Sequence, residues 1–269
     1  ARNELSHIPK LIARYKQAVL AAACSGKLTE DWREKNPNVE PVSVLIMNTQ
    51  IESEKRNWTL TSIGQVAECL DKKRVPVSKE DRLKRQGSIP YYGANGQIDW
   101  IDDFLFDESL IILVEDETFI GRTKPFCYKI SGKSWVNNHA HVLRPKEFID
   151  LDYLNYSLMF YPFTPLTSGT TGRRKLTQTA LMSDPYEVPP LEEQKEIVRR
   201  IEKMFAKIDK MEEEYQKAVK LCDRLEQATL AKAFRGELVP QDPDDEPASV
   251  LLEQVKREKE KGKKGVKSK

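Results

Sequence analysis

Apolar residues recur at helical spacing towards both ends of the chain and at irregular, shorter spacing between them. In the N-terminal part they recur every three or four residues, which predicts a helix over residues 4–24 that stops at Gly26. Its apolar positions are Ile8, Ile12, Tyr15, Val19 and Ala22. After a polar link, residues 41–56 predict a second, short helix.

From residue 188 the helical spacing returns for nearly five heptads, with no glycine or proline between Leu191 and Gly236. This predicts one long helix over residues 188–236, and a helix of about 40 residues is roughly 60 Å long. The apolar seam of this helix comprises Ile197, Ile201, Met204, Ile208, Met211, Tyr215, Cys222 and Leu225. Such a seam is typical of a coiled coil, so we expect these side chains to contact a partner helix. The alternative, a long helix packed on its own domain, fits its length and charged outer faces less well.

Between the two helical regions, residues 57–187 consist of short apolar runs separated by glycine-rich turns. Runs rich in β-branched and aromatic residues predict strands at 110–116, 124–130 and 139–145. We therefore predict an α+β protein, in which one mixed α/β domain is joined to a long coiled-coil helix and a shorter N-terminal helix.

The sequence of the N-terminal helix end is repeated near the C-terminus. AVLAAACSGKL (18–28) shares six residues with ATLAKAFRGEL (228–238), and EPVSVL (40–45) recurs as EPASVL (246–251). A generic alanine-rich helix end used twice is the alternative, but the recurrence of the link and second helix argues against it. The predicted segments are an N-terminal conserved helical segment (1–56, repeated in 224–252), the mixed domain (57–187), the long helix (188–236) and a C-terminal helical segment with a basic tail (237–269).

Composition adds little about partners but restricts the compartment. Of the 269 residues, 39% are hydrophobic and 32% charged, which fits a long solvated helix or a disordered tail. The net charge is only +2, although residues 256–269 hold eight basic and two acidic residues. The four cysteines form no CxxC pair, which argues against a zinc site or disulfides and fits a reducing compartment. Without a long apolar run or a signal peptide, we expect a cytoplasmic protein.

Motifs for catalysis are not found in the sequence: there is no P-loop, glycine-rich cofactor fingerprint or nucleophile elbow. We therefore expect no catalytic activity and no cofactor on this chain. A metal site at His139 and His141 is a weak alternative, since two such rings in a strand would share one face. With three histidines in all, His7 remote and no cysteine close in sequence, we favour a structural turn formed by Asn137, Asn138 and His139.

Five longer motifs lie at the two ends of the long helix and inside the mixed domain. They are VPPLEEQKEIV (188–198), LEQATLAKAFRGELVPQDP (225–243), IPYYGANGQIDWIDDFLFDE (89–108), WVNNHAHVL (135–143) and SGTTGRRKLTQTAL (168–181). Together they resemble the specificity (S) subunits of Type I restriction–modification systems, over almost the whole chain. The family has two target recognition domains and two such helices, so this chain resembles a half-size form or the second half of a subunit.

The resemblance implies a non-catalytic subunit that gives a bacterial or archaeal restriction–modification enzyme its DNA sequence specificity. Its partners would be double-stranded DNA, a methyltransferase (modification) subunit and a restriction/translocase subunit. S-adenosylmethionine, ATP and Mg²⁺ would be bound by those partner subunits. We expect the recognition domain to read a half-site and the long helix to pair with a second copy and set the spacer. The alternative is a coiled-coil adaptor that binds protein and has no DNA affinity.

Basic and amide side chains of the mixed domain have the chemistry to contact phosphates and base edges. The candidate DNA-binding residues are Lys72, Lys73, Arg74, Arg82, Lys84, Arg85, Asn95, Arg122, Asn137, Asn138, His139, Arg173, Arg174 and Lys175. The alternative for the cluster at 72–85 is a solvated, lysine-rich loop. Tyr91, Tyr92 and Trp135 are expected in the core rather than stacked on bases.

Overall fold

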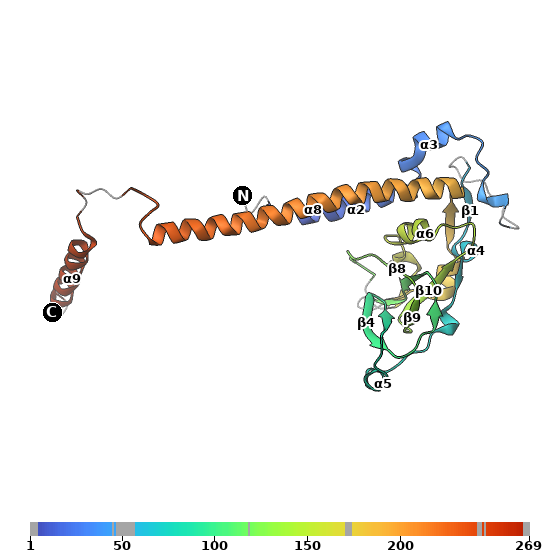
Figure 1. The fold of residues 1–269 in the computed structure, drawn as a ribbon, viewed down its shortest axis with the longest axis horizontal. Helices are drawn as coiled ribbons and strands as arrows, with labels where there is room; N and C mark the ends of the chain where they lie inside the picture. The colour runs from blue at the N-terminus through green and yellow to red at the C-terminus, as the bar shows by residue number, and fades with distance from the viewer. Residues whose placement is uncertain are drawn as a thin grey trace. The chain divides into compact units, whose positions relative to one another are not determined.

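The computed structural model of the chain describes residues 5–44, 46, 57–117, 119–169, 174–240, 244 and 246–265. The chain divides into two compact units: Pro9–Met211, and Ala1–Ile8 together with Glu212–Lys269. Helices and strands are mixed in the first unit, which confirms the predicted α+β class (Figure 1). Among the described residues, no helix is both long and apolar enough to cross a membrane.

The long helix and the N-terminal helix were both predicted from the spacing of apolar residues. The α-helices are α2 (Ile8–Cys24), α3 (Glu30–Lys35), α4 (Ile63–Val66), α5 (Lys79–Lys84), α6 (Leu151–Leu158), α7 (Gln178–Ser183), α8 (Leu191–Phe234) and α9 (Ala248–Gly265). The 3-10 helices are η1 (Lys27–Thr29), η2 (Val42–Val44), η3 (Asp71–Lys73) and η4 (Thr164–Leu166). Within the helix predicted at 41–56, the structure describes the short 3-10 helix η2. Most of the remaining residues of that range lie outside the described residues.

In the described part of the chain, the strands form four small antiparallel or mixed sheets. They are β1 (Thr59–Ser62), β2 (Ala67–Cys69), β3 (Ile89–Gly93), β4 (Gly96–Ile101), β5 (Phe106–Asp107), β6 (Leu110–Val114), β7 (Asp116–Glu117), β8 (Cys127–Ile130), β9 (Lys133–Val136), β10 (Ala140–Pro145), β11 (Ser168–Gly169), β12 (Arg174–Lys175) and β13 (Pro185–Val188). The strand orders are β1-β13, β2-β10-β6-β8, β11-β12-β7 and β4-β3-β9-β5.

The core lies around the sheet β2-β10-β6-β8. All five residues of β6 are buried, since β6 lies between β10 and β8 in the sheet and all five belong to the main core. Helix α6 lies between β8 and α8, where the Tyr156 ring meets the Phe205 ring edge-on at 5.8 Å (Figure 1). The start of α8 is therefore part of the core, and Ile197 and Ile201 are buried in it.

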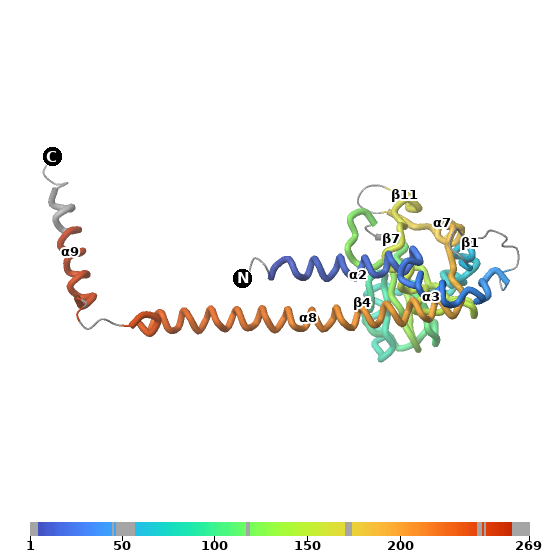
Figure 2. The backbone as a smooth tube through the Cα atoms, turned by 90° about the horizontal axis from the view of Figure 1, so that it is seen from above, coloured from blue at the N-terminus to red at the C-terminus, as the bar shows by residue number. Residues whose placement is uncertain are grey.

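Helix α2 lies antiparallel to the first half of α8, as Figure 2 shows. The Lys16 ammonium is 2.9 Å from the Asp209 carboxylate, whereas Arg200 donates to the carbonyl of Leu28. Residue numbers rise along one helix as they fall along the other, which defines the antiparallel direction.

This packing corrects part of the predicted coiled-coil seam. Ile197, Ile201 and Ile208 are buried within this chain, and Met204 is half-buried. Their partners are α2 and the mixed domain, because the N-terminal segment supplies the second helix that the seam requires. The half-buried Tyr215 and Cys222 and the exposed Met211 and Leu225 lie further along α8.

The first turn of α8 is anchored by two buried polar side chains of the PPLEEQ motif. Glu193 accepts hydrogen bonds from Thr29, Arg33 and Trp58. Gln194 accepts from the Asp150 N–H at 2.7 Å and donates to the carbonyls of residues 148 and 189. The motif therefore joins three segments that are distant in sequence, and these roles were not predicted.

The local backbone repeats where the sequence repeats. Gly26 and Gly236 have φ values of 75° and 72°, and each donates to the carbonyl three residues before it. Only glycine adopts this left-handed conformation without strain. Val44 and Val250 likewise donate to the carbonyls of Pro41 and Pro247. The two copies thus share conformation as well as sequence.

Candidate nucleic-acid interface

Two loops that carry predicted amides meet because strands β3 and β9 run parallel. Tyr92 pairs with Val136, and the Asn137 N–H donates to the Tyr92 carbonyl over 3.0 Å. The hairpin between β3 and β4 therefore lies beside the turn between β9 and β10. The Asn137 side chain approaches Gly93 so closely that a Cβ there would lie 3.3 Å from its Nδ2 atom.

A third loop, between β7 and β8, reaches the same hairpin through Arg122. The Arg122 guanidinium donates to Asn95 Oδ1 over 2.6 Å and to the Pro125 carbonyl over 2.9 Å. It also lies over the Phe126 ring, 5.5 Å from its centroid. Two residues predicted independently to bind DNA are thus brought together, with Asn95 exposed at the hairpin tip.

The turn at 137–139 has the structural character that the sequence suggested. Asn137 Oδ1 accepts from the His139 N–H over 2.9 Å, while Asn138 and His139 are exposed. The His139 ring lies 3.7 Å from the Asp116 carboxylate of β7, and β7 pairs with β12. The hairpin, the two loops and the strands β11–β12 form what we call the loop surface.

The predicted cations divide into exposed side chains and side chains that already have partners. Lys72, Lys73 and Lys84 are exposed, and Lys175 is 58% exposed although it pairs with Glu115. Arg173 lies outside the described residues. Arg174 donates to the hydroxyl and carbonyl of Thr167 within the domain.

Three arginines of the 72–85 cluster are held inside the domain. Arg82 pairs with Asp99 and lies 4.7 Å from the Tyr91 ring centroid, whereas Arg85 pairs with Asp102 and lies 4.7 Å from the Trp135 ring centroid. Arg74 pairs with Asp71 and Glu115, with 11% of its side chain exposed. These guanidinium groups fix α5 and η3 to the sheets, so they are poorly placed to contact DNA.

The aromatic residues follow the expected division. Tyr91 and Trp135 are buried and form a small second core with Ile101, while Tyr92 is half-buried. The Trp135 indole N–H donates to the Val75 carbonyl over 2.7 Å. None of these rings is presented for stacking on bases.

His139 and His141 do not lie on one face of a strand. Strand β10 begins at Ala140, so the exposed His139 precedes it while His141 is buried. The fold also brings Cys69 and Asp71 to His141, which their sequence distance concealed. The His141 ring contacts Asp71 at 2.5 Å through Nδ1 and the Leu176 carbonyl at 2.8 Å through Nε2, so a metal would have to displace one of these bonds. Burial and the Asp71 charge raise the pKa of the Cys69 thiol to about 12, which disfavours the thiolate that metals bind. The alternative of a metal site at His139 and His141 therefore gains no support.

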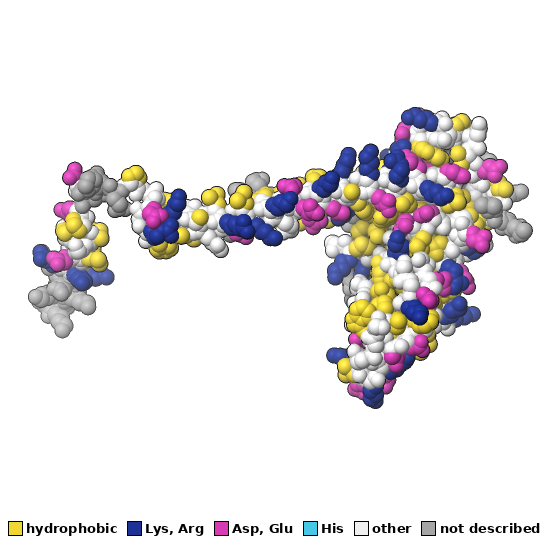
Figure 3. Space-filling view, in the orientation of Figure 1, with side chains coloured by type: hydrophobic (Ala, Val, Ile, Leu, Met, Phe, Trp, Pro, Cys, Tyr) yellow, Lys and Arg dark blue, Asp and Glu magenta, His cyan; other side chains and the backbone are white. Residues whose placement is uncertain are grey.

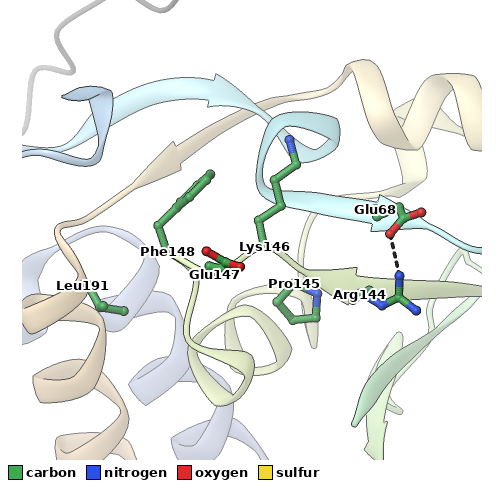
Figure 4. A pocket seen from close by; sticks show the side chains of 7 residues that line it. All are labelled: Glu68, Arg144, Pro145, Lys146, Glu147, Phe148 and Leu191. Carbon is green, nitrogen blue, oxygen red and sulfur yellow. Dashed lines mark hydrogen bonds and ion pairs between the residues drawn. The ribbon is translucent and has the colours of Figure 1, made fainter. Parts of the chain in front are cut away.

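An open hollow of about 760 Å³ lies at the other end of β10 from His139. Figure 4 shows Pro145, Phe148 and Leu191 around it and the ion pair between Arg144 and Glu68. None of the residues predicted to bind DNA lines it, so it forms no part of the loop surface. In the view of Figure 3, acidic and basic side chains are interspersed over the mixed domain rather than gathered in one basic patch.

The model of the family described as "Type I restriction modification DNA specificity domain" matches residues 55–220. The specificity subunit of the Type I restriction enzyme EcoDI from Escherichia coli is 30% identical over 96% of this chain and 63% of its own length. The StySPI specificity subunit from Salmonella potsdam is 29% identical over 96% of this chain and 58% of its own length. The chain therefore spans less than two thirds of the length of these relatives.

Two solved structures share the fold. A chain from a structure of a type I R-M system complex superposes with a TM-score of 0.57 at 16% identity, over 88% of this chain and 57% of that chain. The Type I S subunit from M. genitalium gives a TM-score of 0.51 at 13% identity, over 89% of this chain and 57% of that chain.

Proposed function

The chain belongs to the family of Type I restriction–modification DNA specificity domains, and from this premise we propose that it recognises DNA sequence for a multisubunit restriction–modification enzyme. The observation that carries the proposal is the convergence of the hairpin at Asn95, the Arg122 loop and the 137–139 turn on one surface. Chemistry would reside in partner subunits, a methyltransferase using S-adenosylmethionine and a translocating nuclease using ATP and Mg²⁺.

The loop surface has suitable groups for reading a half-site. Asparagine side chains can pair with adenine through two hydrogen bonds, and arginine can do so with guanine. Asn95, Asn138 and Arg122 are the residues that we assign to base edges. The exposed ammonium groups of Lys72, Lys73 and Lys175 are assigned to phosphates, which would position the domain on the duplex.

Pairing with a second copy is supported by the repeat. Helix α2 corresponds to the last 17 residues of α8 at an offset of 210, and it already lies antiparallel on the start of α8. The end of α8 would pack in the same way on a second copy, where it takes the place of that copy's own α2. The exchange loses the surface pair of Lys16 with Asp209, because Glu226 stands at the position of Lys16. Such a surface pair contributes only about 0.2–1 kcal/mol, so its loss is a small cost.

Two copies related by two-fold symmetry would bind an inverted repeat whose spacer is set by helix length. A heptad inserted after Lys217 lengthens the helix by about 10 Å, the rise of roughly three base pairs. The test is to express the chain with a methyltransferase subunit and sequence the methylated sites. We expect a bipartite target whose spacer grows by about three base pairs in the insertion variant. An unchanged spacer contradicts the proposal that helix length sets the spacer.

The protein-binding adaptor makes the opposite prediction for DNA. Titration of a random-sequence duplex with the full chain and its methyltransferase subunit should show affinity that falls steeply with salt. Absence of any salt-dependent affinity would favour the adaptor. The solution mass of the chain, measured by light scattering over a concentration series, tests pairing separately from DNA recognition.

A further inference from the structure

Four ionisable side chains form a buried network between η3 and the central sheet. We call Asp71, Arg74, Glu115 and His141 the buried charge network. His141 Nδ1 lies 2.5 Å from Asp71 Oδ2, and Arg74 Nη1 donates to Glu115 over 2.6 Å. Arg74 Nη2 is 3.2 Å from Asp71, which closes the chain of contacts.

The network also fixes backbone groups. Asp71 Oδ1 accepts from the Val142 N–H over 2.9 Å, and His141 Nε2 lies 2.8 Å from the Leu176 carbonyl. Arg74 donates to the Ala140 carbonyl as well. The network therefore links η3, β10 and the chain that follows β12 through side chains rather than through a common sheet.

Both carboxylates are held ionised by their neighbours. Burial alone would raise the pKa of Asp71, but the His141 hydrogen bond and the Arg74 charge lower it below the ordinary value. Burial would also raise the pKa of Glu115, but hydrogen bonds from Arg74 and Lys175 lower it. Removal of one member leaves the others buried without full compensation, so the network acts as a unit.

Each part of the network adjoins an exposed cation that the sequence predicted to bind DNA. Lys72 and Lys73 directly follow Asp71 in η3, and they are exposed. Lys175 lies 3.1 Å from Glu115 and precedes Leu176, whose carbonyl His141 contacts. The exposed cations and the buried groups thus belong to the same short segments.

We propose that the buried charge network positions Lys72, Lys73 and Lys175 for contact with DNA phosphates, so that Asp71 and His141 are positioning residues that do not touch DNA. The proposal rests on the function proposed above. It explains why the LDKKR and HAH segments occur in one domain although they are about 70 residues apart, the separation of Asp71 and His141.

Neutralising Asp71 distinguishes positioning from simple electrostatics, because the two predict opposite signs. Asp71→Asn removes a negative charge beside candidate phosphate contacts, so electrostatics alone predicts tighter DNA binding. If Asp71 positions the lysines, its loss weakens binding despite the gain in positive charge. Asp107→Asn is the matched control, since this exposed aspartate of β5 lies outside the network in the same domain.

The test measures the affinity of the full chain with its methyltransferase subunit for a random-sequence duplex over a salt series, below the unfolding transition of every variant. For Asp71→Asn we expect roughly tenfold weaker binding and a salt slope reduced by about two, the loss of about two phosphate contacts. Asp107→Asn should keep the slope and bind as tightly as wild type or slightly tighter. Unchanged or tighter binding by folded Asp71→Asn overturns the proposal.

A second variant and a second readout keep the two proposals separable. If Asp71→Asn does not fold, Glu115→Gln serves in its place, because it also removes a negative charge and releases Lys175. Amide hydrogen exchange of residues 70–74 and 175–176 should accelerate in either variant and not in Asp107→Asn; unaccelerated exchange overturns positioning. If the wild-type chain itself shows no affinity for DNA, the proposed function is refuted instead.

Discussion

The carboxylate of Glu193 accepts a hydrogen bond from the indole N–H of Trp58 over 2.9 Å, although the two residues lie 135 positions apart. The other carboxylate oxygen accepts from the Thr29 hydroxyl over 2.6 Å and from Arg33 over 2.5 Å. One fully buried carboxylate thus connects the N-terminal segment, the entry to the mixed domain and the start of α8.

Replacing this carboxylate should destabilise the Pro9–Met211 unit strongly. In Glu193→Ala the Arg33 guanidinium, which is 13% exposed, loses its anionic partner, and the Trp58 N–H loses its acceptor. Breaking a buried pair in this way costs about 3–5 kcal/mol of the free energy of unfolding. Urea unfolding followed by tryptophan fluorescence measures the change.

The neighbouring Glu192 supplies the matched control. It is exposed in the same first turn of α8, where its charge favours the helix N-terminus. Glu192→Ala should cost no more than about 1 kcal/mol. Equal losses for the two variants would contradict the central role of Glu193.

The sequence predicted the long helix well and its anchoring not at all. Heptad spacing placed the helix at 188–236, against the observed Leu191–Phe234, because spacing is a local property of the chain. The role of Glu193 depends on Trp58 and Arg33, whose proximity only the fold creates. The acidic first turn of α8 suits the electrostatics of a helix N-terminus, but Glu193 within it is a buried hydrogen-bond acceptor.

The same limit applies to the candidate site. Lysines and arginines of the 72–85 cluster look alike in sequence, yet Arg74 meets Glu115, 41 positions away, whereas Lys72 and Lys73 are exposed. The proximity of Arg122 to Asn95 was equally hidden, although both are among the candidate DNA-binding residues of the mixed domain. The residue types were predictable, and their pairing was not.

Acid should destabilise the start of α8 through Glu196, which pairs with Arg199 and Arg200. Hydrogen bonds from Arg199 and, against the opposing effect of burial, from Arg200 lower the pKa of Glu196 from 4.5 to about 2. A carboxyl with a lowered folded-state pKa contributes stability above the unfolded value, and this contribution is lost as pH falls from 4.5 towards 2. Glu196→Gln should therefore flatten the fall of unfolding free energy over this interval.

Denaturant titrations at a series of acidic pH values measure this effect. Glu202→Gln is the control for net charge, because Glu202 is an exposed glutamate on the same helix. If the unfolding free energy of Glu196→Gln falls in acid as steeply as that of the wild type and of Glu202→Gln, protonation of Glu196 is not a cause of the acid destabilisation.

Arg122 should affect which DNA sequence is recognised more than how tightly DNA is held. Arg122→Lys keeps the positive charge but loses the planar fork that contacts Asn95 and Pro125 and that suits guanine. We expect discrimination at one base position to fall by about 1–3 kcal/mol, with the salt slope unchanged. Sequencing of methylated sites in cells that express the variant with a methyltransferase subunit tests this.

Lys73→Ala provides the opposite pattern as a control. Loss of one phosphate contact should weaken binding to all sequences alike and reduce the salt slope by about one. An Arg122→Lys variant with the wild-type target, or with a reduced slope and no change of target, would assign Arg122 to phosphates instead of bases.

Self-association should depend on Leu230 and not on Leu221, because the repeat assigns the two leucines to different faces. At the offset of 210, Leu230 corresponds to Leu20, which is 3% exposed in its packing on α8, and Leu221 corresponds to Leu11, which is 57% exposed. In this chain Leu230 and Leu221 are themselves 51% and 67% exposed. If the end of α8 packs on a second copy as α2 packs on its own, Leu230 is buried there and Leu221 stays in water.

Leu230→Lys places a charge at the contact twice in a symmetric pair. Burial of a leucine contributes about 1.5–3 kcal/mol, so the loss of two should weaken association by at least about 100-fold. Leu221→Lys introduces the same residue on the same helix and should leave the association constant within about threefold, since exposed positions contribute little. Sedimentation equilibrium over a concentration series measures both constants. Equal weakening by the two variants would show that copies meet through another face of α8, and no weakening by either would remove α8 from the interface.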